Sequence, residues 1–200
     1  MAEEIARQFT LDSEVFEAIC KVRREEFVPN GFRHQAFSLD ALPISAKQWI
    51  SSPLTVAKMT HYLDHKGCDS VLEVGCGSGY QAAVLSQLFR RVFTIERISV
   101  LFNEAKSKFS SQELHNIHVR FDDGQFGWNE YAPYDRILFS ASTNSIPHDL
   151  FRQLKDGGVL VAPIDENGEQ KIYRFKREGN SIIPTYLEGC EFVPILEGTA

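Results

Sequence analysis

Residues Val71–Tyr80 read VLEVGCGSGY, and this stretch decides the fold. Its first half is a short apolar run with one acid, which is typical of a strand buried on both faces. Its second half carries three glycines in a G-x-G-x-G spacing, where a strand turns into a helix and the backbone comes close to a ligand. A dinucleotide-binding turn places its last glycine one residue later, as G-x-G-x-x-G. The spacing therefore indicates a ligand other than a pyrophosphate.

Strand and helix patterns alternate on both sides of this turn. Such alternation predicts an α/β fold, with a mostly parallel, twisted sheet and helices on both of its faces. Near the C-terminus, segments punctuated by Gly or Pro predict an antiparallel strand extension. The expected parallel strands are 70–74, 92–96, 117–121, 134–140 and 157–163, and the expected terminal strands are 170–176, 181–186 and 191–195.

The first third of the chain reads as helical. Residues 11–20 form an amphipathic pattern behind Asp12 or Ser13 as the N-cap, and Ser52 with Pro53 predicts the start of another helix. Its expected buried stripe is Val56, Met59, Thr60 and Leu63. We divide the single expected domain into a helical cap with a candidate active-site loop (1–65), a ligand-binding core (66–165) and C-terminal strands (166–200).

Composition narrows the class of protein. The chain has 200 residues, 43% of them hydrophobic and 24% charged, which excludes a disordered, collagen-like or coiled-coil protein. Its net charge of −6 argues against a nucleic-acid binder, although Lys21, Arg23 and Arg24 predict a small basic patch. The four cysteines and six histidines show no metal-ligand spacing, so we expect no metal. Without a signal-peptide pattern or an apolar run of ~20 residues, we expect a cytoplasmic protein that does not enter membranes.

Acidic residues at three expected strand ends point to one ligand. Glu73 precedes the glycines and would attract a cation, while Glu96 lies where a carboxylate binds a ribose diol. A ligand with a cationic group and a ribose but no phosphate matches S-adenosylmethionine. Asp123 could accept a hydrogen bond from the adenine amino group, and Gly124 would leave room for the ring. The alternatives are a tight strand–helix turn without a ligand and, at Asp123, a plain turn.

Four segments resemble the protein-L-isoaspartate O-methyltransferases, and the match covers nearly the whole chain. They are REEFVP (Arg24–Pro29), LPISAKQWISSP (Leu42–Pro53), the glycine motif, and APYD (Ala132–Asp135) followed in order by FVP (Phe192–Pro194). The resemblance implies a Rossmann-like methyltransferase fold. It implies methylation of the α-carboxylate of L-isoaspartyl residues in damaged proteins, with S-adenosylhomocysteine as the second product. The ester then closes to a succinimide, which partly reopens as normal aspartate, so the expected role is protein repair.

The resemblance also carries over candidate residues. The family's active-site serine falls on Ser51, for which the alternative is a residue that only precedes a helix. Residues Gln48, Trp49 and Ile50 would lie along the cofactor. With the residues of the glycine turn and the acidic positions, the expected cofactor-binding set also contains Glu73, Gly75, Gly77, Ser78, Gly79, Glu96, Asp123 and Gly124.

Departures from the family pattern fall near the expected acceptor. Trp49 stands where the family has Thr, Ser45 and Lys47 stand where it has Gly, and Ser142–Asn144 replaces an apolar run. These residues keep two alternatives open. The first is a related methyltransferase for a different carboxylate or small nucleophile, and the second is a cofactor-binding adaptor without catalysis. The expected partners are isoaspartyl peptides and proteins, and a monomer is expected.

Overall fold

A seven-stranded sheet in the order β5-β4-β3-β6-β7-β8-β9 forms the centre of the molecule. The computed structural model describes residues 1–200. Strands β5, β4, β3, β6 and β7 are parallel, whereas β8 and β9 continue the sheet antiparallel. The expected mostly parallel sheet and its antiparallel extension are thus confirmed. The bounds are β3 Ser70–Val74, β4 Arg91–Glu96, β5 Ile117–Phe121, β6 Tyr134–Phe139, β7 Leu154–Glu166, β8 Glu169–Glu178 and β9 Ser181–Gly189.

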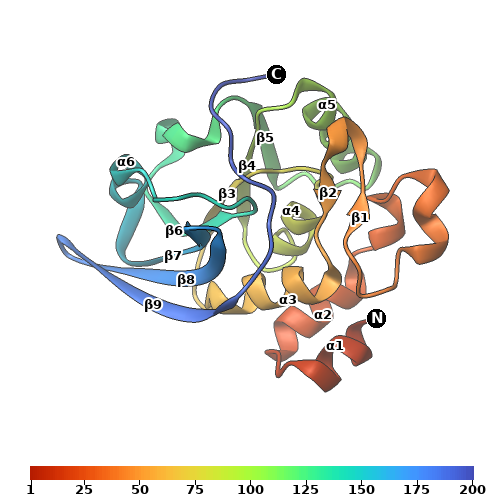
Figure 1. Cartoon of the computed structure of the whole chain (residues 1–200), viewed down its shortest axis with the longest axis horizontal. Helices are drawn as coiled ribbons and strands as arrows, with labels where there is room; N and C mark the ends of the chain where they lie inside the picture. The colour runs from red at the N-terminus through yellow and green to blue at the C-terminus, as the bar shows by residue number, and fades with distance from the viewer.

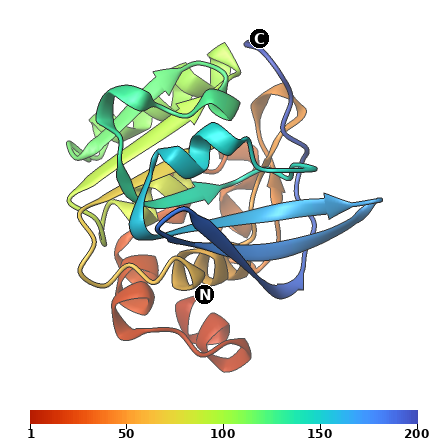
Figure 2. The ribbon, with the colours of Figure 1, turned by 90° about the vertical axis from the view of Figure 1, so that its left-hand side faces the viewer.

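Helices cover both faces of the sheet because side chains alternate along each strand. Val71 packs with the larger apolar cluster, which includes side chains of the N-terminal helices, α4 and α5, and Leu72 packs on the opposite face with residues such as Trp128 and Leu150. Figures 1 and 2 show this layering, with the N-terminal helices in red below the sheet. The helices are α1 Ala2–Gln8, α2 Ser13–Lys21, α3 Pro53–Tyr62, α4 Tyr80–Leu85, α5 Ser99–Ser111 and α6 His148–Arg152.

The start of α3 follows the expected chemistry. The Ser52 hydroxyl accepts a hydrogen bond from the backbone N–H of Thr55 (3.0 Å), and Pro53 is the first helical residue. All four residues of the expected stripe are buried. Before α3, the chain forms a two-stranded hairpin of β1 (Leu42–Pro43) and β2 (Trp49–Ile50).

The expected terminal strand 191–195 is wrong. These residues form only an isolated bridge in which Pro194 lies beside Ser142. The Ser142 N–H donates to the Val193 carbonyl (2.8 Å) and the Ile195 N–H donates to the Ser142 carbonyl (2.7 Å). Pro194 has no N–H to extend a ladder, so the chain leaves the sheet edge after β9. In Figure 1 this C-terminal tail, residues 192–200, runs in blue across the front of the molecule to the terminus.

The predicted basic patch is also wrong, because Arg24 is fully buried. Arg23 stays at the surface and pairs with Glu25 and Glu26. Arg24 begins a short 3₁₀ helix that directs its side chain inward, beneath the segment leading to β1. A charge pattern alone does not distinguish these two arginines, because the turn that separates them depends on tertiary packing.

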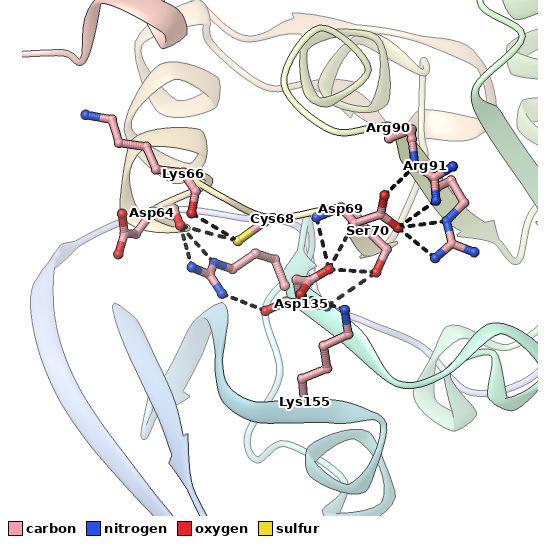
Figure 3. Close-up of polar contacts among 10 residues, drawn as sticks. Asp64, Lys66, Cys68, Asp69, Ser70, Arg90, Arg91, Asp135 and Lys155 are labelled. Atoms are coloured by element: carbon pink, nitrogen blue, oxygen red, sulfur yellow. Dashed lines mark hydrogen bonds and ion pairs between the residues drawn. The ribbon is translucent and has the colours of Figure 1, made fainter.

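Charged side chains tie the strands together at the end opposite the glycine turn (Figure 3). Asp135 of β6 accepts from Lys155 of β7 (2.8 Å) and from the backbone N–H of Asp69, which precedes β3 (3.1 Å). Hydrogen bonds from Arg90 and Arg91 lower the pKa of Asp69 to about 2. This network joins β3, β4, β6 and β7 far from the glycine turn, so it fixes the sheet without occupying the ligand edge.

None of the helices is both long enough and apolar enough to cross a bilayer.

Candidate functional site

A cleft lies at the carboxyl ends of β3, β4 and β6. The chain runs from β3 outward to β4 and β5 and then returns to β6 on the other side of β3. Open α/β sheets bind ligands at such a switch point. The cleft encloses about 890 Å³, including space open to solvent, and its walls include the β1–β2 hairpin and the C-terminal tail.

The glycine turn forms the floor of the cleft. Gly75 and Gly77 have φ values of +95° and +54°, a region that favours glycine. A Cβ built on Gly77 would meet only the Ile44 Cδ1 atom, at 4.0 Å, so the backbone faces open space there. The Ser78 hydroxyl accepts from the Tyr80 N–H (3.2 Å) and thereby stabilises the turn before α4. The main chain is therefore accessible to a ligand along this turn.

Glu96 at the end of β4 is held in one orientation. One carboxylate oxygen accepts the Gly77 N–H (2.7 Å) and the other accepts the Ile98 N–H (2.8 Å). The residue is only 4% exposed, yet it lines the cleft. Each carboxylate oxygen keeps a further lone pair, so a diol could bind both oxygens at once.

Glu73 at the end of β3 is fully buried beside the cleft. Its carboxyl group accepts from the Thr94 hydroxyl (2.6 Å) and the Ser140 hydroxyl (3.0 Å). Burial raises the pKa of Glu73 to about 8, because these two hydrogen bonds offset only part of the desolvation. A cationic group bound in the cleft would favour the ionised carboxylate.

The β1–β2 hairpin brings the expected catalytic loop to the cleft. Ser51 follows β2 and lines the cleft; its carbonyl accepts from Arg24, whereas its hydroxyl makes no hydrogen bond within the protein and is free to meet a ligand. Trp49 is 53% exposed at the cleft wall. The hairpin is anchored to α5 by the Ser45 hydroxyl, which donates to Glu104 (2.7 Å). Lys47 adopts a φ of +58° at a position where the resembled family has glycine.

Two residues of the expected binding set do not line the cleft. A Cβ on Gly79 would lie 2.8 Å from the Phe109 ring, so this glycine allows α4 and α5 to pack closely. Asp123 is buried, and its two oxygens accept the N–H groups of Gln125 (3.0 Å) and Gly198 (2.7 Å). The other members lie along the cleft: Gln48, Trp49, Ile50, Ser51, Glu73, Gly75, Gly77, Ser78, Glu96 and Gly124.

The sequence analysis missed Ser140 and the tail residues Val193–Leu196, which also line the cleft. Ser140 directly follows β6, and its place at the carboxyl end of a strand was a usable signal. The Ser142–Asn144 departure has a different role from the one we expected. Ser142 and Thr143 are buried, and Ser142 binds the tail instead of facing the cleft.

Comparison with known proteins agrees with the geometry. The family model described as Protein-L-isoaspartate(D-aspartate) O-methyltransferase (PCMT) matches residues 1–200. A protein-L-isoaspartate O-methyltransferase of Helicobacter pylori (strain P12) is 56% identical over 199 residues, covering 99% of this chain and 95% of the relative. The chain belongs to the protein-L-isoaspartate O-methyltransferase family. A Maricaulis maris (strain MCS10) member of the same name is 46% identical over 94% of this chain and 89% of its own.

Solved structures of this family share the fold. A protein-L-isoaspartate O-methyltransferase structure superposes with a TM-score of 0.89 at 24% identity, covering 97% of this chain and 65% of that longer chain. A second, described as a putative protein-L-isoaspartate O-methyltransferase of Plasmodium falciparum in complex with S-adenosyl-L-homocysteine, has a TM-score of 0.86 at 21% identity. It covers 98% of this chain and 96% of that one. The Rossmann-like methyltransferase fold is thus confirmed.

Proposed function

We propose that the protein transfers a methyl group from S-adenosylmethionine to the α-carboxylate of L-isoaspartyl residues in damaged proteins. The observation that carries this proposal is the juxtaposition of two parts of one cleft. The oriented carboxylate of Glu96 lies over the glycine turn, and the free hydroxyl of Ser51 lies on the hairpin beside it. Family membership, shown by the 56% identical relative, gives the activity class.

The residues of the cleft fit S-adenosylmethionine. Glu96 has oxygens available for the ribose hydroxyls, and the buried Glu73 matches a positively charged amino group. Open space over Gly77 leaves room for the ligand to approach the turn. The bound cofactor supplies an electrophilic methyl group on a sulfonium that is its own leaving group.

Little acid–base chemistry is required of the protein. A carboxylic acid has a pKa of about 4, so the acceptor is already a nucleophilic carboxylate at neutral pH. Ser51 donates a hydrogen bond that orients this carboxylate, and the hairpin and the tail form two walls of the cleft. Alignment of the reacting atoms can lower a barrier by up to roughly 7–11 kcal/mol. The residues therefore catalyse by positioning.

The direct test uses two synthetic peptides that differ only in isoaspartate versus aspartate. We expect labelled methyl from S-adenosylmethionine to reach the isoaspartyl peptide alone and to be released by base as methanol, because an ester is formed. Label on neither peptide, with S-adenosylhomocysteine binding verified by calorimetry, would refute the isoaspartyl assignment.

Replacement of Ser51 by alanine tests the catalytic loop. We expect Ser51→Ala to lower kcat about ten- to a hundredfold, because the acceptor loses the group that orients it. Affinity for S-adenosylhomocysteine should stay within about twofold, since the hydroxyl makes no bond that shapes the cofactor cleft. Ser52→Ala is the matched control, because it removes the helix cap and should lower Tm without the same loss of kcat. An unchanged kcat in Ser51→Ala would reduce Ser51 to a loop residue.

A methyltransferase for a different acceptor is the second candidate, and the exposed Trp49 at the cleft wall favours it. If the indole narrows the acceptor site, Trp49→Thr should raise kcat/KM on the isoaspartyl peptide by about tenfold or more. If isoaspartate is the native acceptor, this exchange should lower kcat/KM. The two outcomes have opposite signs, so one steady-state measurement separates the candidates. An adaptor without catalysis is contradicted by turnover in either case.

The proposal includes a monomer that acts on proteins in the cytoplasm, without a nucleic acid or a membrane as partner. The net charge of −6 argues against a nucleic-acid partner, and the lack of a long apolar run argues against a membrane-spanning segment. Light scattering at the concentration used for the activity assay measures the mass directly. A mass of twice 22.7 kDa would contradict the monomer.

A further inference from the structure

Arg24 lies under the hairpin that carries Ser51 and joins three segments of the chain. Its guanidinium donates to the backbone carbonyls of Ala36 (2.6 Å), Asp40 (3.2 Å) and Ser51 (3.1 Å). Ser51 also lines the cleft. The guanidinium therefore holds the main chain of the expected catalytic residue directly.

The same side chain also contacts the cofactor side of the cleft. The Arg24 Cζ atom lies 5.5 Å from the centre of the Tyr80 ring, and Tyr80 is the first residue of α4 after the glycine turn. Tyr80 lines the cleft and is itself buried. One side chain thus contacts both the first residue after the glycine turn and the loop that would orient the acceptor.

The stability of the fold does not explain this arginine. It is fully buried, and no carboxylate lies within ion-pair distance of its guanidinium. Its Nε atom makes no hydrogen bond, and burial lowers its pKa. A buried charge with incomplete pairing usually costs more than a well-packed apolar side chain of the same size. A guanidinium at this buried position therefore points to a role other than packing.

We propose that Arg24 is a positioning residue for methyl transfer, which sets Ser51, and hence the acceptor carboxylate, at the correct distance from the cofactor. The guanidinium suits this task because its planar fork of N–H groups fixes several carbonyls at once. An ammonium group has no such geometry. This inference rests on the proposed function for its activity readout, but the loop position that it predicts is measurable without turnover.

The first test compares Arg24→Lys, Arg24→Met and, as matched control, Arg23→Ala. Arg23 is the adjacent arginine, but it lies at the surface in exposed ion pairs. We expect kcat per folded molecule to fall by about tenfold or more in Arg24→Met, because misplacement of a catalytic group by about 1 Å can cost a hundredfold. Arg24→Lys should recover only part of this loss. Arg23→Ala should keep the wild-type kcat, and S-adenosylhomocysteine affinity should stay within about threefold in all variants.

The second test measures the environment of the hairpin directly, without turnover. The chain has two tryptophans, Trp49 on the hairpin beside Ser51 and Trp128 in the core. In protein labelled with 5-fluorotryptophan, the ¹⁹F resonance of Trp49 should shift or broaden in Arg24→Met and Arg24→Lys, whereas that of Trp128 should not. Arg24→Ala should also regain turnover when guanidinium is added at millimolar concentrations, but not when urea or sodium chloride is added.

The outcomes separate this inference from the proposed function. A wild-type kcat in folded Arg24→Met together with an unchanged Trp49 resonance would overturn the positioning role. Equal shifts of both tryptophan resonances, with no rescue by guanidinium, would also overturn it, because they indicate a general packing defect. If wild-type protein does not methylate the isoaspartyl peptide, the proposed function fails, and the Trp49 resonance still decides whether Arg24 holds the loop. If Arg24→Met does not fold, Arg24→Lys and the guanidinium rescue carry the test.

Discussion

Glu73→Gln should make the ligand-free protein more stable at pH 7 by about 3 kcal/mol, while it weakens cofactor binding. The carboxyl group is fully buried, and its pKa is raised from the usual 4.5 to about 8. Glutamine keeps the shape and the hydrogen bonding to Thr94 and Ser140, whose hydroxyls can reorient. Glutamine does not ionise, so the variant avoids the charge that burial makes unfavourable.

The sign follows from linkage. Because the folded pKa of Glu73 lies above its unfolded value, the unfolded chain ionises first as pH rises. The contribution of Glu73 to the free energy of unfolding is therefore full below about pH 4.5, falls between about pH 4.5 and 8, and is lost above pH 8. The stability gain of Glu73→Gln should accordingly be near zero at pH 4.5 and grow through this window. Urea unfolding at a series of pH values measures it.

The same change should weaken binding, since the cationic amino group of the ligand loses a carboxylate partner. We expect S-adenosylhomocysteine affinity to fall on the order of tenfold or more, by calorimetry at pH 7. Glu130→Gln is the control, because Glu130 is exposed and makes no ion pair, so neither stability nor affinity should change. A stability difference that does not vary with pH would show that Glu73 does not titrate in this window.

Glu96→Ala should reduce affinity for S-adenosylhomocysteine on the order of 1–3 kcal/mol, which is about 5- to 150-fold in Kd. The variant loses the proposed acceptor of the ribose hydroxyls and leaves the Gly77 and Ile98 N–H groups without their partner. The ligand then lacks a carboxylate that two backbone N–H groups hold in one orientation.

A ligand pair isolates the ribose contact from general damage to the turn. Wild-type protein should bind methylthioadenosine more tightly than its 2′-deoxy analogue, and Glu96→Ala should bind the two equally. Continued discrimination by the variant would assign the ribose to another residue. Glu130→Ala again serves as the surface control, with wild-type affinity for both ligands.

Local chemistry explains the sequence predictions that the structure confirms. Apolar runs and glycine spacing placed the parallel strands, and the Ser52–Pro53 pair placed the start of α3. Each of these signals acts within a few residues, so it is visible without the fold. The expected strand 191–195 failed because the tail pairs with the main chain only at Ser142, and its apolar side chains line the cleft instead of a sheet.

The sequence by itself determined the mostly parallel sheet, the glycine turn and the acids at the strand ends, because strand and turn residues are encoded locally. Only the tertiary structure decided the burial and the hydrogen-bond partners of those acids. Thr94 in β4 and Ser140 just after β6 bind Glu73 from its two sides, and Gly198 reaches Asp123 from the far end of the chain. The same holds for Arg24, which local charge assigns to the surface and packing places under Ser51. Burial and long-range hydrogen bonds depend on which distant segments meet, and local sequence patterns do not show this.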